Sequence, residues 1–143
     1  MGLRFVRSAS FCFALVLSLP VILLAADAEG CKDSPVIARV PGSTLDKCGH
    51  QKSGQATVSV RKGKGVVDRT LEGDYQSWGY VTRDGIGDSE VFRNIEDSLK
   101  QAGFQIDYES NPERITAHKG NVWYSLENRG DYYKQIVVTV KTK

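Results

Sequence analysis

The chain has 143 residues, a formal net charge of +2, three cysteines and two histidines. A chain of this length is typical of a single domain. Its nearly balanced charge gives no electrostatic reason to expect nucleic acid as a partner. Two histidines without a G-x-S-x-G motif do not indicate a serine hydrolase, so composition alone favours a non-catalytic protein.

Residues 1–28 have the pattern of a secretory signal peptide. Arg4 and Arg7 precede an apolar run from Phe11 to Leu24, which is short for a membrane span. The segment Ala26-Asp27-Ala28 then supplies small residues at the two positions that a signal peptidase reads. We therefore expect an exported protein that begins at Glu29, in the periplasm, at the outer membrane or outside the cell. No second apolar run follows, so no membrane span is expected in the mature chain.

The cysteines predict one disulfide bond. Cys12 leaves with the signal peptide, and Cys31 and Cys48 remain in a compartment where disulfides form. An alternative is lipidation of Cys31 as the mature N-terminus, although Glu29 departs from the residues that lipoprotein signals place before the cysteine. A metal site is not expected, because Cys48 and His50 are too close in sequence for a usual pair of zinc ligands.

Residues 29–54 are predicted to form an N-terminal arm, because they are polar and interrupted by Gly and Pro. The regular domain, residues 55–143, begins with a strand in which Ala56, Val58 and Val60 alternate with polar residues. The segment Lys62-Gly63-Lys64-Gly65 predicts a turn. A second strand follows from Val66 to Tyr75, and Trp78 to Val81 continues the sheet after a bend.

One amphipathic helix is predicted next. Asp88 or Ser89 provides its N-cap, and Gly103 stands just beyond its end. The spacing of its apolar residues produces one hydrophobic stripe, which must pack on a sheet. The stripe consists of Val91, Phe92, Ile95, Leu99 and Ala102.

Four more strands follow the helix, in segments where apolar and polar residues alternate between short Gly, Asn and Pro turns. The predicted class is α+β, a mostly antiparallel sheet of about five to seven strands with one helix on one face. The four strands extend from Phe104 to Glu109, Ile115 to His118, Val122 to Glu127 and Tyr132 to Lys141.

Three short motifs resemble the N-terminal module of bacterial envelope proteins that carry an OmpA-like peptidoglycan-binding domain. They are Cys31-Lys32-Asp33, Arg39-Val40-Pro41-Gly42 and Arg93-Asn94-Ile95-Glu96. The chain stops at Lys143, where the peptidoglycan-binding domain would begin. The resemblance implies an envelope location and a binding or accessory role, and it implies no catalytic residues.

Aromatic side chains provide the candidate binding surface. If the helix leaves one sheet face uncovered, Trp78, Trp123 and Tyr133 could stack on a glycan or contact an envelope protein. The alternative is that the arm and the helix cover them as core residues. We therefore predict an exported, non-catalytic binding or envelope-associated accessory module without metal or cofactor. The alternatives are a small secreted hydrolase and a secreted ligand or inhibitor.

Overall fold

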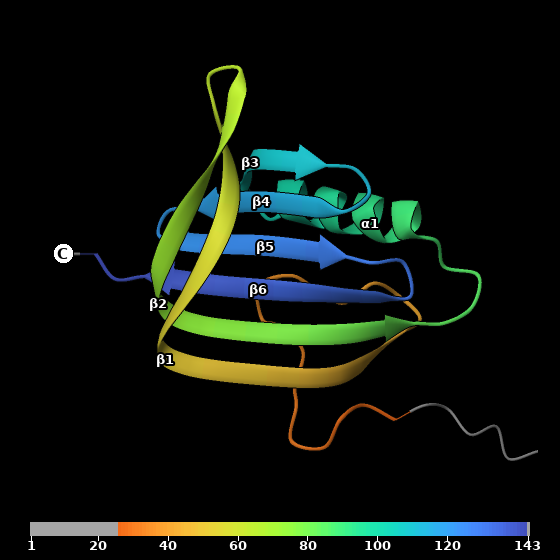
Figure 1. Ribbon diagram of the computed structural model, residues 1–143. Helices are drawn as coiled ribbons and strands as arrows, with labels where there is room; N and C mark the ends of the chain where they lie inside the picture. The colour runs from red at the N-terminus through yellow and green to blue at the C-terminus, as the bar shows by residue number, and fades with distance from the viewer. Residues whose placement is uncertain (1–25, 143) are drawn as a thin grey trace, which may run out of the picture.

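The computed structural model describes residues 26–142. Six strands form one antiparallel sheet in the order β1-β2-β6-β5-β4-β3, and one helix lies against it (Figure 1). This confirms the predicted α+β class, with the sheet as the dominant element. The elements are β1 (Ser43–Lys62), β2 (Gly65–Thr82), α1 (Asp88–Gln101), β3 (Gln105–Ser110), β4 (Arg114–Lys119), β5 (Val122–Asn128) and β6 (Tyr132–Val140).

The first hairpin is much longer than the sequence pattern predicts. Strand β1 already begins at Ser43, so residues 43–54 of the predicted arm belong to the sheet. Strand β2 also runs without interruption through the bend expected before Trp78. The pattern is misleading because β1 is an edge strand whose side chains from Asp46 to Ser53 are all exposed. Such a stretch lacks the alternation that identifies a half-buried strand.

Two glycines face each other where this hairpin leaves the plane of the sheet. Gly54 pairs with Gly73, and Gly73 is also the first residue of β2 that pairs with β6. A Cβ atom on Gly73 would lie 2.1 Å from the backbone oxygen of Thr139. Glycine therefore permits a close approach of two backbones at the bend. The distal hairpin, defined here as residues 55–72, folds over one face of the sheet and projects beyond it (Figure 1).

Each face of the sheet has its own hydrophobic core. Helix α1 and the N-terminal arm, residues 26–42, cover one face and bury the predicted helix stripe against it. The distal hairpin covers part of the opposite face, where Val58 and Leu71 belong to a second cluster. The sheet residues of that second cluster are Trp123, Ile136 and Val138. The arm and the distal hairpin thus complete a fold that one helix could not cover alone.

The helix and the last four strands lie close to their predicted positions. The helix N-cap is Gly87, rather than Asp88 or Ser89, and the Asp88 carboxylate instead accepts a hydrogen bond from the Ser89 amide at 2.8 Å. Gly103 follows the helix with a φ of +83°, a conformation that favours glycine. The predicted C-terminal signal is therefore confirmed.

The disulfide Cys31–Cys48 joins the arm to β1, as predicted. The bridge spans a sequence separation of 17 residues. Side chains of β2 add further contacts to the arm, because Trp78 Nε1 donates to the Lys32 carbonyl at 2.9 Å and Tyr80 Oη donates to Asp33 at 3.0 Å. The arm is therefore a structural part of the domain.

Candidate binding surface

The structure does not leave the three candidate aromatic residues exposed. Trp78, Trp123 and Tyr133 are only 6%, 8% and 0% exposed. The arm covers the first and the third, and Tyr133 Oη accepts a hydrogen bond from the Val40 amide at 2.9 Å. These two side chains belong to the core on the helix side of the sheet.

Trp123 belongs to the core on the opposite face, so the structure does not bring the three residues together. The guanidinium carbon of Arg69, from the distal hairpin, lies 4.7 Å from the centre of the Trp123 ring. The imidazole of His118 stacks on the same ring at 4.8 Å. All three aromatic residues therefore follow the alternative expectation and stabilise the fold.

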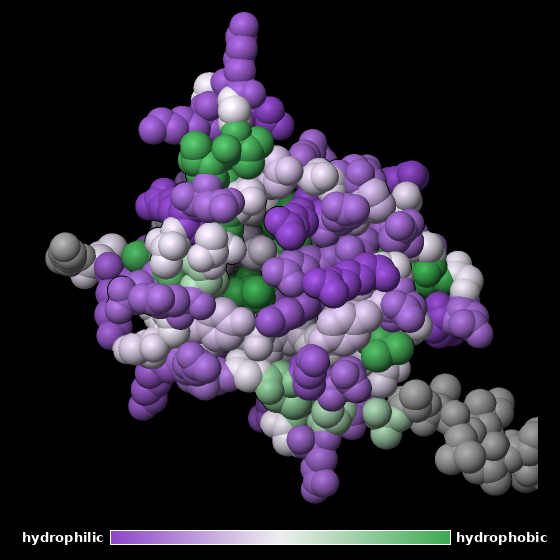
Figure 2. Space-filling model, in the orientation of Figure 1, coloured by the Kyte–Doolittle hydropathy of each residue, from purple (hydrophilic) through white to green (hydrophobic). Residues whose placement is uncertain are grey.

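The exposed apolar residues lie mainly elsewhere, on the hairpin tip, defined here as residues 61–70. Val66 and Val67 are 49% and 42% exposed, and the only other large hydrophobic residue exposed to this degree in residues 26–142 is Val81, at 43%. Figure 2 shows a hydrophobic patch on the projecting hairpin, directly beneath hydrophilic side chains at its end. Valine suits a strand, and two neighbouring exposed valines on a projecting element make the tip a candidate contact surface.

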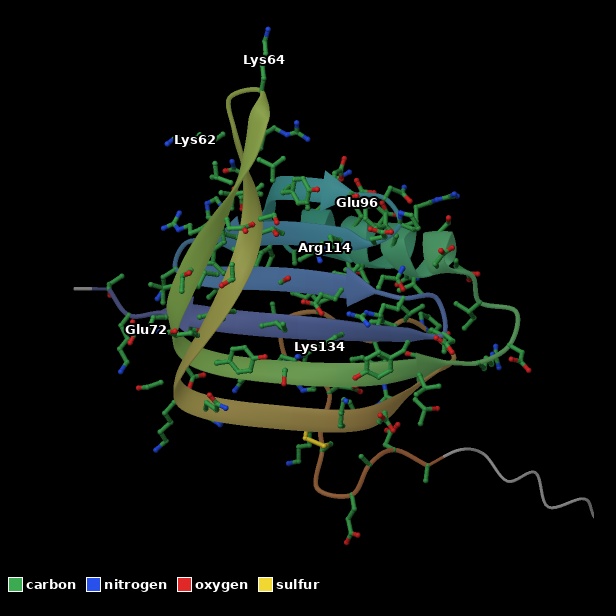
Figure 3. The ribbon with its side chains drawn as sticks, viewed as in Figure 1. Lys62, Lys64, Glu72, Glu96, Arg114 and Lys134 are labelled. Carbon is green, nitrogen blue, oxygen red and sulfur yellow. A yellow bond between two sulfur atoms is a disulfide. The ribbon has the colours of Figure 1, made fainter. Side chains whose placement is uncertain are left out.

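The same tip carries concentrated positive charge. It contains four basic side chains and one acidic side chain, Asp68, and all ten tip residues are exposed. Figure 3 shows Lys64 pointing away from the molecule at the end of the hairpin, with Lys62 beside it. The local net charge of +3 on a projecting element produces a positive potential that attracts anionic partners. The basic residues are Arg61, Lys62, Lys64 and Arg69.

These cations form no ion pair with other side chains of the described chain. Within residues 26–142, the ion pairs involve Arg39, Lys100 and the two histidines, and none involves a basic residue of the tip. The Asp68 carboxylate accepts a hydrogen bond from the Ser59 hydroxyl at 3.2 Å. Lys62 and Lys64 therefore face solvent, whereas Arg69 lies against the Trp123 ring and Arg61 lines a groove that also contains carboxylates.

Two surface grooves flank the distal hairpin. The first has a volume of about 520 Å³ and lies between the tip, α1 and β3, with Glu96, Asp107 and Glu109 among its lining residues. The second, of about 650 Å³, lies where β2 diverges from β6 and is lined in part by Leu71 and Val140. The first groove is lined by three carboxylates and by the basic side chains of Arg61 and Lys100, so it does not concentrate positive charge as the end of the tip does.

The two histidines lie in separate places, each beside one aspartate. His118 Nδ1 is 2.6 Å from Asp107 Oδ2, and His50 Nε2 is 2.7 Å from Asp74 Oδ1. Among residues 26–142, no group of three or more His, Cys, Asp or Glu side chains has an arrangement that could hold a metal ion. The helix in this part of the chain is also too short and too polar to cross a membrane.

The sequence pattern predicts a turn at Lys62–Gly65 and a strand from Val66, but it assigns no binding role to the tip. The available signal was the pair Val66-Val67 directly after the basic turn, because adjacent strand residues point to opposite faces and these two valines therefore lie on both sides of the hairpin. Comparison with known proteins adds no functional assignment, since no family model and no curated protein matches the chain.

Proposed function

We propose that this protein is an exported, non-catalytic binding module whose hairpin tip contacts an anionic lipid surface of the cell envelope. The observation that carries the proposal is the combination of net positive charge and two exposed valines on one projecting element. The proposal agrees with the predicted signal peptide, Cys31–Cys48 disulfide and resemblance to an envelope module. In this role the tip rests in the headgroup region and does not span the bilayer.

The chemistry of the tip favours lipid over other anionic partners. A lysine or arginine near an anionic membrane surface contributes about 1 kcal/mol. Burial of two half-exposed valines adds roughly 1 kcal/mol each. Residues 61–70 contain no aromatic side chain on which a nucleic-acid base could stack. Three or four cations and two valines together give about 5 kcal/mol, which corresponds to weak, reversible binding in the submillimolar range.

The backbone of the tip also suits an interfacial environment. Residues 61 and 62 pair with residues 66 and 65 across the turn, so much of the backbone is hydrogen-bonded within the hairpin. Hydrogen-bonded backbone groups lose little free energy when they leave water, whereas each unpaired group would cost several kcal/mol in hydrocarbon. The long side chains of Lys62 and Lys64 can reach phosphate groups while the neighbouring valines contact acyl chains.

Vesicle co-sedimentation tests the proposal. The exported protein is incubated with vesicles of phosphatidylcholine alone and with vesicles containing phosphatidylglycerol, and its bound fraction is measured. We expect binding to the anionic vesicles only, weakened by salt because surface charges are screened. The double variant Lys62→Glu/Lys64→Glu should abolish it, and Val66→Ser/Val67→Ser should weaken it several-fold.

Two exposed residues elsewhere provide matched controls. Lys52→Glu changes an exposed lysine in the proximal part of β1, and Val81→Ser changes the exposed valine at the end of β2. Both should leave vesicle binding unchanged, and thermal unfolding should show that every variant is folded. The proposal fails if the protein does not bind anionic vesicles, or if the tip variants bind as the controls do. Capture of an acidic envelope protein through the tip, without vesicle binding, would indicate a protein partner instead.

A further inference from the structure

Residues 27 and 28 are integrated into the folded domain, although the sequence pattern assigns them to the signal peptide. The two carboxylate oxygens of Asp27 accept hydrogen bonds from Arg39 Nη1 and Nη2, both at 2.7 Å. Asp27 Oδ1 also accepts from the Leu45 amide at 2.9 Å, and the Ala28 amide donates to the Leu45 carbonyl at 2.8 Å. Asp27 thus connects the start of the described chain to both the arm and β1.

Arg39 is the centre of this network. Its guanidinium also donates to Asp33 at 2.9 Å and to the Ser43 carbonyl at 3.2 Å, and it lies 5.6 Å from the centre of the Tyr80 ring. A paired, two-point contact between arginine and a carboxylate is among the stronger hydrogen-bonded arrangements. The Arg39 side chain therefore holds two carboxylates, and the loss of Asp27 would remove its two shortest hydrogen bonds while those to Asp33 and Ser43 remain.

The position of the mature N-terminus decides whether this network exists in the exported protein. Cleavage after Ala28 would remove Asp27 and the hydrogen bond between the Ala28 amide and the Leu45 carbonyl. Lipoprotein processing would start the chain at Cys31 and remove the same groups. The Ala28 carbonyl also accepts from the Cys31 amide at 3.2 Å, so the bond after Ala28 lies in a turn. Of the three starts considered, Asp27, Glu29 and Cys31, a start at Asp27 is the one that retains all of these contacts.

We infer that the signal peptidase hydrolyses the Ala26–Asp27 bond, so that the mature protein begins at Asp27 rather than Glu29. The reaction consumes one water and leaves a carboxylate on Ala26 and an amino group on Asp27. Ala26 supplies a small residue directly before the scissile bond, whereas the third residue before that bond is Leu24, which is apolar but not small. The choice of the Ala26–Asp27 bond therefore rests on the contacts of Asp27 and Ala28 in the folded domain and not on the cleavage pattern. This inference rests on the predicted signal peptide and is independent of the membrane-binding proposal.

Intact-mass spectrometry and N-terminal sequencing of the exported protein test the inference. The full chain, residues 1–143, is produced in a bacterial host and recovered from outside the cytoplasm. We expect a single unmodified species that starts at Asp27 and has the mass of one intact disulfide. A start at Glu29, which lacks one Asp and one Ala residue, would overturn the inference. An acylated species starting at Cys31, or an uncleaved chain, would also overturn it.

A stability measurement provides a second, independent readout. In the full chain, Asp27→Asn should lower the melting temperature of the exported protein and accelerate exchange of the Leu45 amide hydrogen several-fold. Glu29→Gln is the matched control, because it changes a neighbouring exposed carboxylate that forms no ion pair within residues 26–142. If Asp27 is removed on export, the Asp27→Asn protein will be identical to wild type in mass and in melting temperature.

Discussion

The substitution Gly73→Ala tests whether the hairpin bends as described. Its Cβ atom would lie 2.1 Å from Thr139 O and 2.8 Å from Thr139 C, distances too short for any real Cβ contact. Both neighbours are backbone atoms of β6, so relief requires β2 and β6 to separate locally. Overpacking of this kind costs about 1–3 kcal/mol, and a lost backbone hydrogen bond adds about 1 kcal/mol. We expect a loss of about 3 kcal/mol and a melting temperature lower by roughly 10 °C.

Gly65→Ala is the matched control, because it adds the same methyl group to the same strand. The nearest atom to its Cβ would be the Lys62 carbonyl oxygen at 3.7 Å, an ordinary contact. This variant should be neutral or slightly more stable, since alanine reduces the entropy of the unfolded chain. Thermal unfolding followed by circular dichroism gives both melting temperatures. If Gly73→Ala melts within roughly 3 °C of Gly65→Ala, the close approach of β2 and β6 at the bend is refuted.

Three further predictions concern the arm and the second core. Arg39 hydrogen bonds lower the pKa of Asp27 from 3.8 to about 2, so its stabilisation is complete above about pH 4 and is lost as the pH falls through 2. The free energy of unfolding of Asp27→Asn should therefore fall less than that of the wild type as the pH decreases from 4 to 2. Identical pH profiles of the two proteins would contradict this prediction. The double variant Cys31→Ser/Cys48→Ser should lose about 3 kcal/mol in urea unfolding, and a loss below about 1 kcal/mol would show that the bridge does not stabilise the arm. Trp123→Ala should lose about 3–5 kcal/mol, whereas near-native stability would argue against a core role.

The sequence predicts the helix and the last four strands well because their signals are local. In α1, apolar residues recur at helical spacing, and the positive φ of Gly103 corresponds to the glycine expected beyond the C-terminus. In β4, Ile115 and Ala117 are fully buried, as alternation predicts. Each of these patterns depends on residues within a few positions of one another, so no knowledge of the tertiary structure is needed.

The first hairpin and the binding surface are predicted poorly because they depend on distant partners. The bend requires Gly54 and Gly73 to face each other, and neither glycine alone distinguishes a bend from a loop. Whether Trp123 is exposed depends on Arg69 and the rest of the distal hairpin, which covers it from another part of the chain. Periodicity identifies which side chains share a face, but it does not show what covers that face.

The extended hairpin also explains why the tip is a better candidate surface than the aromatic residues. Its middle part is fixed to the body, because Val58 and Leu71 pack in the second core. Packing in this core therefore explains why Val58 and Leu71 are apolar. It does not explain why Val66 and Val67 are apolar, because they lie beyond this core and are about half exposed. Threonine would satisfy the same strand preference at both positions without exposing a purely apolar side chain to water. Under the proposed function, two valines beside cations that form no ion pair suit contact of the tip with a surface that is both anionic and apolar, which is the chemistry of a lipid headgroup layer.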